Sequence, residues 1–366
     1  MSNQHESNGS LAGIARPALI GASLAMALCA SAHAAGSSVQ MYGTVDLGVE
    51  HFDNGAGSTT QMGNGVLNPS VIGFRGTENL GGGTSAFFHL ETSFCANGVQ
   101  ANATTSSQQF CGPGFMGRTS IVGLRGDWGK LEMGRMFTLS NGDFYAIDPL
   151  HNDSISPFGN TNVAPIGEPV WDSQAIAYYS PSFDGFSVAG LYQFGGGLGL
   201  RQTTGGYNLH AGYGSGPLYV GADYEVQYSA PGVTSLKHSM IVASYDFHVV
   251  TLGAYLARNR PDAASGNPAL DAEALTASVP LGNWTLIGEY AQQSDKSVSL
   301  PTTRQYNLGL TYSLSKNTSL YALYARTTNY NTFTNIVDAF GNNGAPITTG
   351  SGAASSALAV GMSMNF

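Results

Sequence analysis

Charged side chains are scarce in this sequence, and they separate by sign along the chain. Only 10% of the 366 residues are charged, whereas ordinary soluble domains carry about 25%. Five basic residues fall within 61 positions: Arg75, Arg118, Arg125, Lys130 and Arg135. The next segment, 138–172, holds five acids and no Lys or Arg: Asp143, Asp148, Asp153, Glu168 and Asp172. Charged side chains that are grouped in this way can act on ions and polar solutes through their electric field. Whether they do so depends on the strands and loops that hold them in place.

Catalytic chemistry finds no support in the sequence. A hydrolase needs a nucleophile beside a base that a third group orients. Histidines such as His151, His210, His238 and His248 are scattered over separate segments. Neither the nucleophile motif Gly-x-Ser-x-Gly nor the phosphate-binding motif Gly-x-x-x-x-Gly-Lys-Ser/Thr occurs. We therefore predict that the chain is not an enzyme and has no cofactor or metal site.

The first 34 residues are predicted to be a signal peptide that is cleaved after Ala34. Arg16 precedes an apolar stretch, 18–29, and the small residues Ala32 and Ala34 suit the cleavage site. The apolar stretch has about 12 residues, whereas a transmembrane helix needs about 20. This segment therefore favours export of the chain over anchoring of the chain in a membrane.

The predicted mature chain is acidic and keeps two cysteines. Removing the first 34 residues leaves 13 of the 14 basic and 22 of the 23 acidic residues, a net charge of −9. This sign disfavours nucleic acid as a partner. Cys95 and Cys111 form an even pair in an exported chain, which predicts a disulfide that closes one loop. Two free thiols are the alternative, and zinc is disfavoured because no His lies near either Cys in the sequence.

Apolar and polar residues alternate over runs of about ten positions, which indicates strands. In 357–366 every even position is large and apolar: Leu358, Val360, Met362, Met364 and Phe366. In 305–314 the even positions are again apolar, and the odd ones include Gln305 and Asn307. A run of ten matches a tilted transmembrane strand and exceeds the usual soluble strand of about five or six.

The connections and aromatic residues favour a membrane barrel over a soluble sandwich. Tight connections such as 80–83 and 126–129 alternate with long polar ones, which is the pattern of an up-and-down barrel. Aromatic residues recur near strand ends, as an interfacial girdle requires. Sixteen candidate strands run from 39–51 to 356–366, with a loop predicted at 52–69 before the second strand at 70–79. We predict an all-β fold: one transmembrane antiparallel 16-stranded β-barrel that spans 35–366.

Several motifs resemble those of Gram-negative general diffusion porins of the β-proteobacterial branch. They are Ser38 to Asp46, Ile72 to Gly83, Val122 to Gly126, Met133 to Arg135 and the terminal Phe366. The resemblance implies a homotrimer in the bacterial outer membrane, in contact with lipid and lipopolysaccharide. It also implies short periplasmic turns, long external loops and a third external loop folded into the lumen. The terminal Phe366 resembles the assembly signal read by the outer-membrane insertion machinery.

Strand alternation predicts which charges face the lumen. Arg75 and Arg125 alternate with apolar neighbours that face lipid, so both should point inward. A cation on the lipid face at the bilayer midplane costs about 2–4 kcal/mol. Strict alternation puts Arg135 outside, but a bulge at Gly134 can change the phase, and the resemblance implies a lumen position for it. Asp46 and Glu91 are also expected to face the lumen.

The resemblance implies that the acidic segment is the constriction loop. Its acids Asp143, Asp148, Asp153 and Glu168 would then face the arginine wall of Arg75, Arg125 and Arg135 and set a transverse field. Ser156 stands where many relatives carry Glu, which weakens a cation preference, and Val71 stands where relatives often carry Arg, which weakens an anion preference.

The function expected from these features is a water-filled channel for passive diffusion of ions and small hydrophilic solutes, filtered by size and charge. Two alternatives stay open. One is a substrate-selective channel with aromatic residues such as Tyr42, Tyr219 and Tyr255 along its wall. The other is a barrel whose external loops serve in adhesion or as receptors.

Overall fold

The computed structural model describes residues 38–53, 55, 57–98, 115–151, 155–159, 163–195, 205–230, 232–296, 301–330 and 352–366. The predicted signal peptide, 1–34, lies outside these residues. Within the described part of the chain, no helix is both long and apolar enough to cross a membrane. Strands make up most of it, and the N-terminal strand begins at Ser38.

The strands follow one another along the chain with one α-helix between β6 and β7. Their bounds are β1 Ser38–Asp53, β2 Ser58–Asn64, β3 Val71–Gly81, β4 Thr84–Ser93, β5 Thr119–Gly126, β6 Gly129–Phe137, β7 Trp171–Tyr179, β8 Phe186–Gln193, β9 Gly206–Ser215, β10 Leu218–Ala230, β11 Val233–Asp246, β12 Thr251–Asn259, β13 Leu270–Leu281, β14 Trp284–Asp295, β15 Pro301–Ser313, β16 Thr318–Asn329 and β17 Ser355–Asn365. The helix is α2, Leu139–Ile147, and a short 3-10 helix, η1, spans Ala263–Ser265.

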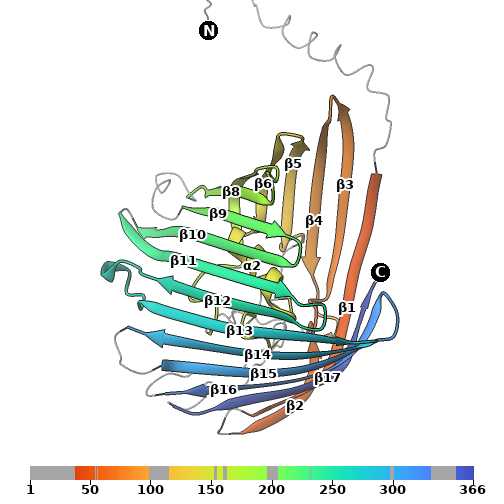
Figure 1. Cartoon of the computed structure of the whole chain (residues 1–366), viewed down its shortest axis with the longest axis vertical. Helices are drawn as coiled ribbons and strands as arrows, with labels where there is room; N and C mark the ends of the chain where they lie inside the picture. Colours follow the sequence, from red (N-terminus) through yellow and green to blue (C-terminus); the bar gives the residue numbers. More distant parts are fainter. Residues whose placement is uncertain are drawn as a thin grey trace, which may run out of the picture.

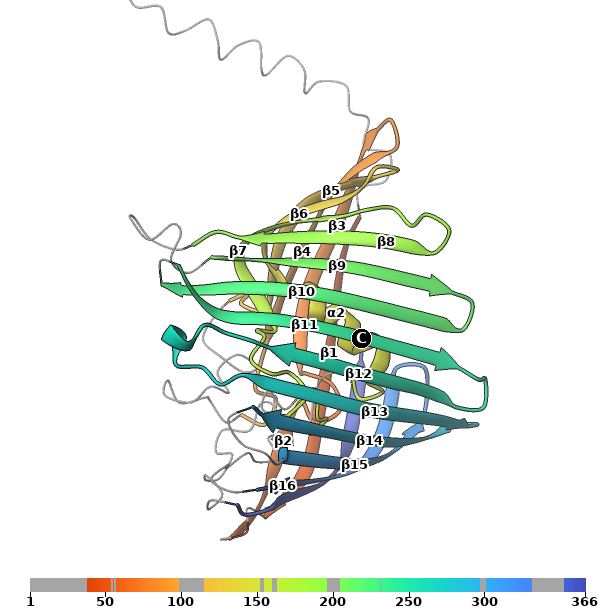
Figure 2. The ribbon, with the colours of Figure 1, turned by 60° about the vertical axis from the view of Figure 1, so that its left-hand side comes forward.

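Antiparallel pairing between successive strands closes the sheet into a barrel (Figures 1 and 2). Closure comes from β1 and β17, whose register runs from Thr44 opposite Asn365 to Asp53 opposite Ser356. Both β2 and β3 pair with β1, β2 along 47–53 and β3 along 38–44. These two together occupy one position, so the 17 described strands fill 16 positions. The 16-stranded antiparallel barrel predicted from the sequence is confirmed.

One strand was missed, because 58–64 was predicted to be part of a loop. Between β2 and β3 the chain bends at 65–70 over the inner face of β1, where the buried Asp46 holds it. The Asp46 carboxylate accepts hydrogen bonds from the backbone N–H groups of Val66 at 2.9 Å and Asn68 at 3.1 Å. The hydroxyl of Tyr321 donates to the same carboxylate at 2.9 Å. These contacts compensate the N–H groups that leave the strand ladder.

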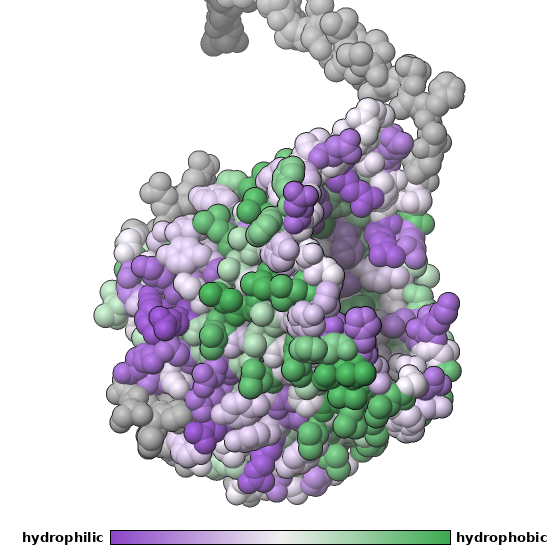
Figure 3. Space-filling view, in the orientation of Figure 1, coloured by the Kyte–Doolittle hydropathy of each residue, from purple (hydrophilic) through white to green (hydrophobic). Residues whose placement is uncertain are grey.

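The two faces of the sheet differ as the alternation predicts. Val360 in β17 is 51% exposed, whereas its neighbour Ala359 is fully buried. In β1, Val49 is 49% exposed while Glu50 is fully buried. In Figure 3 hydrophobic side chains gather over the middle of the visible barrel wall, and hydrophilic ones gather toward its edges. A wall with apolar residues outside and polar residues inside is the arrangement of a membrane barrel.

Aromatic side chains gather at the end of the barrel that carries the tight connections. Trp128 stacks on Tyr178 with ring centroids 6.5 Å apart, and Trp284 packs against Tyr312 at 4.4 Å. Both tryptophans lie in or next to a two-residue connection, β5 to β6 or β13 to β14. Amphipathic rings favour the membrane–water boundary, so this end marks one edge of the apolar band.

Helix α2 lies inside the barrel, against β8–β12 (Figures 1 and 2). The Thr138 hydroxyl caps its N-terminus by accepting from the N–H of Asn141 at 3.3 Å. Phe144 packs against Phe158 and Tyr255, with ring centroids 5.4 and 5.6 Å apart. These rings are almost fully buried and belong to one apolar cluster with wall residues of β11–β14. The helix is therefore attached to one side of the interior.

Candidate channel interior

Two exposed arginines lie on the inner face of β3 and β5. The guanidinium of Arg75 donates to the Gln40 side-chain oxygen at 2.8 and 2.9 Å and lies 5.3 Å from the ring of Tyr42. Arg125 donates to the Thr77 hydroxyl at 3.1 Å. Because Thr77 is two positions from Arg75 on the same face, the two cations lie along one strip of wall. Their side chains stay open to the interior.

A buried ion pair stands next to this strip. Arg118 is 5% exposed, and its Nε donates to Glu91 Oε1 at 2.6 Å. The hydroxyl of Tyr42 donates to the other Glu91 oxygen at 2.6 Å and also contacts His89. The Arg118 guanidinium lies 5.3 Å from the ring of Trp171. Strand alternation alone cannot reveal such a contact, because the side chain of Arg118 turns toward a partner on the next strand.

Arg135 occupies a different place from the other predicted wall arginines. The register between β6 and β7 shifts between Gly134 and Met136, where the sequence suggested a bulge. Arg135 Nε donates to the carbonyl of Gly117 and its Nη1 to the Ser173 hydroxyl, both at 2.5 Å. Its guanidinium lies 5.4 Å from the ring of Trp171. These contacts link β6 to β7 and to the end of the preceding loop.

The acids of the loop between β6 and β7 are buried. Asp143 on α2 is 2% exposed, Asp148 is 2% exposed and Glu168 is 5% exposed. Asp148 accepts from the N–H of Leu150 at 2.7 Å and from the Ser156 hydroxyl at 2.8 Å. Ser156 therefore stabilises the loop internally. The fourth predicted acid, Asp153, lies outside the described residues.

Two of these acids attach the loop to the barrel wall. The Asp143 carboxylate accepts from the hydroxyl of Tyr219 on β10 and lies 3.5 Å from Nδ1 of His210 on β9. Glu168 Oε1 lies 3.3 Å from Nε2 of the fully buried His238 on β11. Burial raises the pKa of Glu168 to about 8. The structure thus brings Asp143 and Glu168 to β9–β11, and not to the arginines of β3 and β5.

Further acids lie on the wall beneath the loop. Asp223 is 5% exposed and Glu225 is 1% exposed on the inner face of β10. The Gln227 amide donates to Glu225 at 2.9 Å and to Asp172 at 3.4 Å, so it bridges the wall and the end of the loop. Strand alternation carries no signal that loop acids and wall acids meet at this place, because the contact joins residues that are far apart in the sequence.

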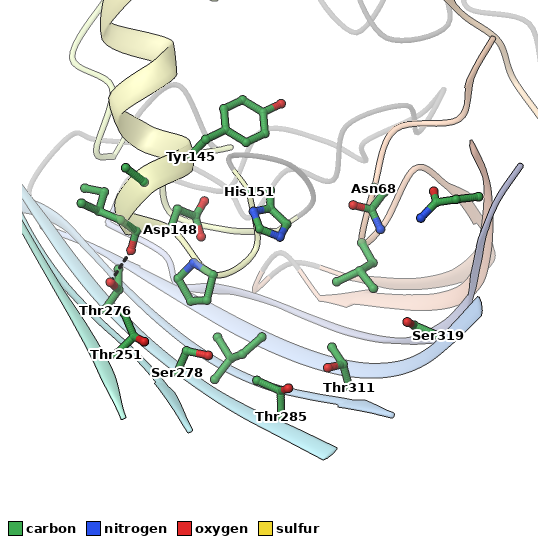
Figure 4. Close-up of a pocket in the computed structure, with 16 residues that line it drawn as sticks. Asn68, Tyr145, Asp148, His151, Thr251, Thr276, Ser278, Thr285, Thr311 and Ser319 are labelled. Atoms are coloured by element: carbon green, nitrogen blue, oxygen red, sulfur yellow. Dashed lines mark hydrogen bonds between the residues drawn. The ribbon is translucent and has the colours of Figure 1, made fainter. Parts of the chain in front are cut away.

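Two cavities border the loop inside the barrel. One, of about 480 Å³, lies between the C-terminal end of α2 and the wall of β12–β17. In Figure 4 its wall carries a row of hydroxyl side chains: Thr251, Thr276, Ser278, Thr285, Thr311 and Ser319. Across the same cavity lie Tyr145, His151 and Asn68 (Figure 4). The second, of about 550 Å³, lies between α2 and the wall of β4–β10 and is bordered by His89, Lys130 and Asp143.

Two further predictions concern the disulfide of Cys95 and the terminal residue Phe366. Cys95 is disulfide-bonded, and its predicted partner Cys111 lies outside the described residues, so the pairing stays a prediction. The terminal Phe366 exchanges two backbone hydrogen bonds with Gly43 of β1, at 2.9 and 3.1 Å. Its ring occupies the space beside Gly43 where a side chain would otherwise lie. The last residue therefore helps to close the barrel.

Comparison with known proteins places the chain among bacterial porins. A family model described as Gram-negative porin matches residues 21–332. Outer membrane porin protein 32 of Delftia acidovorans is 30% identical over 81% of this chain and 86% of that protein. Major outer membrane protein P.IB of Neisseria meningitidis is 29% identical over 81% of this chain and 89% of that protein.

Solved structures agree with these sequence relatives. An anion-selective porin from Comamonas acidovorans superposes with a TM-score of 0.76 at 26% identity, covering 90% of this chain and 100% of that one. OmpT of Vibrio cholerae, in a trimer form, shares the fold with a TM-score of 0.65 at 15% identity, covering 90% of this chain and 100% of that one. The chain therefore belongs to the Gram-negative porin family, and its barrel is an outer-membrane channel for passive diffusion.

Proposed function

We propose that ions and small hydrophilic solutes cross this channel through the space between the loop 138–170 and the barrel wall, where they are filtered by size and charge. Three features of the interior support this proposal. Helix α2 and the apolar cluster around Phe144 reduce the free width of the barrel. The remaining cavities are bordered by hydroxyl and other polar side chains. Polar walls permit solutes to pass without losing their hydration.

We further infer that the channel prefers anions. The observation that carries this inference is the difference in exposure between the two signs. Arg75 and Arg125 are exposed on the inner wall, whereas Asp143, Asp148 and Glu168 are buried. A solute can approach an exposed guanidinium directly, and exposed charges act over about 8 Å at physiological ionic strength, whereas hydrogen-bond partners and the loop itself keep a solute away from the buried carboxylates. A similar protein, from Comamonas acidovorans, is described as an anion-selective porin.

Single-channel recording in planar bilayers tests both statements. We expect ohmic steps that no single sugar blocks, and a reversal potential in a KCl gradient that indicates chloride preference. Steps that one sugar blocks would favour a substrate-selective channel. A cation-selective reversal potential would contradict the assignment of the exposed arginines to the ion path.

We also propose a homotrimer that is embedded in lipid and lipopolysaccharide and is assembled by the outer-membrane insertion machinery. The exposed apolar outer face of the strands supports a membrane and subunit contact surface, and one structural neighbour is described in a trimer form.

Electrophoresis without heating should show a trimer. Deletion of Phe366 should reduce assembly in the outer membrane. N-terminal sequencing of the mature protein should begin at Ala35.

A further inference from the structure

We propose that Asp143, His210 and Asp223 form a binding site for one divalent transition-metal ion, of the class of Zn²⁺, which fastens α2 to the wall of the barrel. Asp143 comes from α2, whereas His210 and Asp223 lie directly opposite each other on β9 and β10. One ligand atom from each residue lies within 4.8 Å of the other two. The three residues belong to separate elements, so a bound ion would cross-link the loop to two strands.

The distances between the ligand atoms suit such an ion. Nδ1 of His210 lies 3.5 Å from Asp143 Oδ2 and 3.3 Å from Asp223 Oδ2. Zinc binds nitrogen and carboxylate oxygen at about 2.0–2.2 Å, usually in a tetrahedron, which puts neighbouring ligands about 3.4 Å apart. Imidazole together with carboxylate is a donor set for transition metals, whereas Mg²⁺ and Ca²⁺ prefer oxygen ligands alone.

Two buried carboxylate oxygens of the cluster accept no hydrogen bond from the described residues. The side chain of Asp143 is 2% exposed and that of Asp223 is fully buried. Asp143 Oδ2 and Asp223 Oδ1 have no hydrogen-bond partner among the described residues. Both carboxylates share the single Nδ1 of His210, and buried carboxylates are costly unless each is paired or binds a metal. A divalent ion with a neutral imidazole would balance both negative charges, and Asp143 Oδ2 already faces His210.

The surroundings orient Asp143 for this role. A Cβ atom at Gly221 on β10 would overlap the Asp143 carboxylate, so a glycine there makes the close approach possible. The Tyr219 hydroxyl donates to Asp143 Oδ1, which leaves Oδ2 directed at the cluster. Such second contacts are typical of groups that hold a metal ligand in place.

The site also has an entry path and room for a fourth ligand. Asp143, His210 and Tyr219 border the cavity of about 550 Å³ between α2 and the wall. A water molecule from this cavity would complete a tetrahedron with the three protein ligands. An ion could enter from the lumen without opening the barrel.

The test is metal binding by the mature chain, refolded in detergent without a histidine tag and stripped with a chelator. Isothermal titration with Zn²⁺ at pH 7 should give one site per chain. Titration with Co²⁺ should give the visible absorption bands of a tetrahedral cobalt centre, which adventitious surface binding does not produce. Asp223→Asn and His210→Gln should each weaken the affinity at least 100-fold.

Glu225→Gln is the matched control, because it removes one buried carboxylate from the same face of β10 and leaves all three ligands. We expect its affinity to stay within about threefold of the parent chain. The proposal is overturned if the parent chain binds less than one ion, or if cobalt shows only octahedral absorption. Equal losses in Asp223→Asn and Glu225→Gln would also overturn it, because they would indicate diffuse attraction by negative charge. If a substituted chain does not refold, the number of ions that the parent chain binds and its cobalt spectrum still test the proposal.

Discussion

The two charged walls of the barrel use their charges in opposite ways. On β3 and β5, Arg75 and Arg125 are held by polar and aromatic neighbours but stay exposed to the interior. On β9–β11, Asp223, Glu225 and His238 are covered by the loop that carries α2. A passing solute can come into contact only with a charge that water reaches. The difference therefore separates residues that filter from residues that hold the loop in place.

The ion pair between Arg118 and Glu91 provides the largest expected effect. Arg118→Ala leaves a buried carboxylate without its cation, and breaking a buried pair in this way costs about 3–5 kcal/mol. We expect the free energy of unfolding in urea to fall by that amount in refolded protein. The control is Lys296→Ala, because Lys296 pairs with Asp271 at 2.5 Å with 49% of its own side chain exposed. Loss of that exposed pair should cost less than about 1 kcal/mol. Similar costs for the two substitutions would show that Arg118 is not buried against Glu91.

Gly221→Val should release α2 from the acidic wall. The new side chain would occupy the place of the Asp143 carboxylate, and overpacking of this kind costs about 1–3 kcal/mol. We expect noisier single-channel currents and faster proteolysis within 138–170. Gly288→Val is a fair comparison, since a Cβ there meets nothing within 4 Å, and it should leave both unchanged. If the two variants behave alike, the contact between Asp143 and β10 does not hold the loop.

Arg75→Ala should shift the reversal potential toward cations. A unit charge acts on an ion about 4 Å away in water with about 1 kcal/mol, which corresponds to a change of roughly fivefold in the permeability ratio. Arg258→Ala removes an exposed cation from a position of β12 that alternates with buried Tyr255 and Ala257, and therefore lies on the outer face. That control should leave the reversal potential where it was. An unchanged value in Arg75→Ala would remove this residue from the ion path.

Titration of Glu168 should make the stability of the protein depend on pH. Its pKa is raised by burial to about 8 in the folded protein, so the folded state binds a proton that the unfolded state releases near its ordinary pKa of about 4.3. This contribution to stability is complete below about pH 4 and is lost as pH rises to about 8. Thermal unfolding followed across this range should show the decline. Glu168→Gln should flatten the curve, and an unchanged curve would show that this carboxyl is not buried in its neutral form.

Local sequence patterns were sufficient to predict which face of the barrel wall most strand residues occupy. Alternation with a period of two assigned Val360 and Ala359 to opposite faces, because successive side chains of a strand must point in opposite directions. It failed at Ser58–Asn64, a short polar strand whose continuation into β3 is broken by the bend at 65–70. That bend is held by Asp46, whose carboxylate also accepts a hydrogen bond from Tyr321, 275 positions later. Contacts of that range leave no local pattern.

The arrangement of the interior shows the same limit. The sequence indicated that 138–172 is acidic and that Arg75 and Arg125 face inward, because both statements need only composition and strand phase. It could not say which wall the acidic segment would touch. Asp143 meets Tyr219, 76 positions later, only because the barrel closes and the apolar face of α2 packs on Tyr255 and its neighbours.

The sequence by itself determined a membrane barrel and the inner or outer face of most strand residues. Each of these properties follows from the local geometry of an extended chain at an apolar boundary. Only the tertiary structure decided which charges stay in water, since that depends on what packs over them. Burial under the loop that carries α2 made Asp143, Glu168 and the acids of β10 into contacts that hold the loop, whereas Arg75 and Arg125 stay exposed within the described part of the chain and can act on solutes.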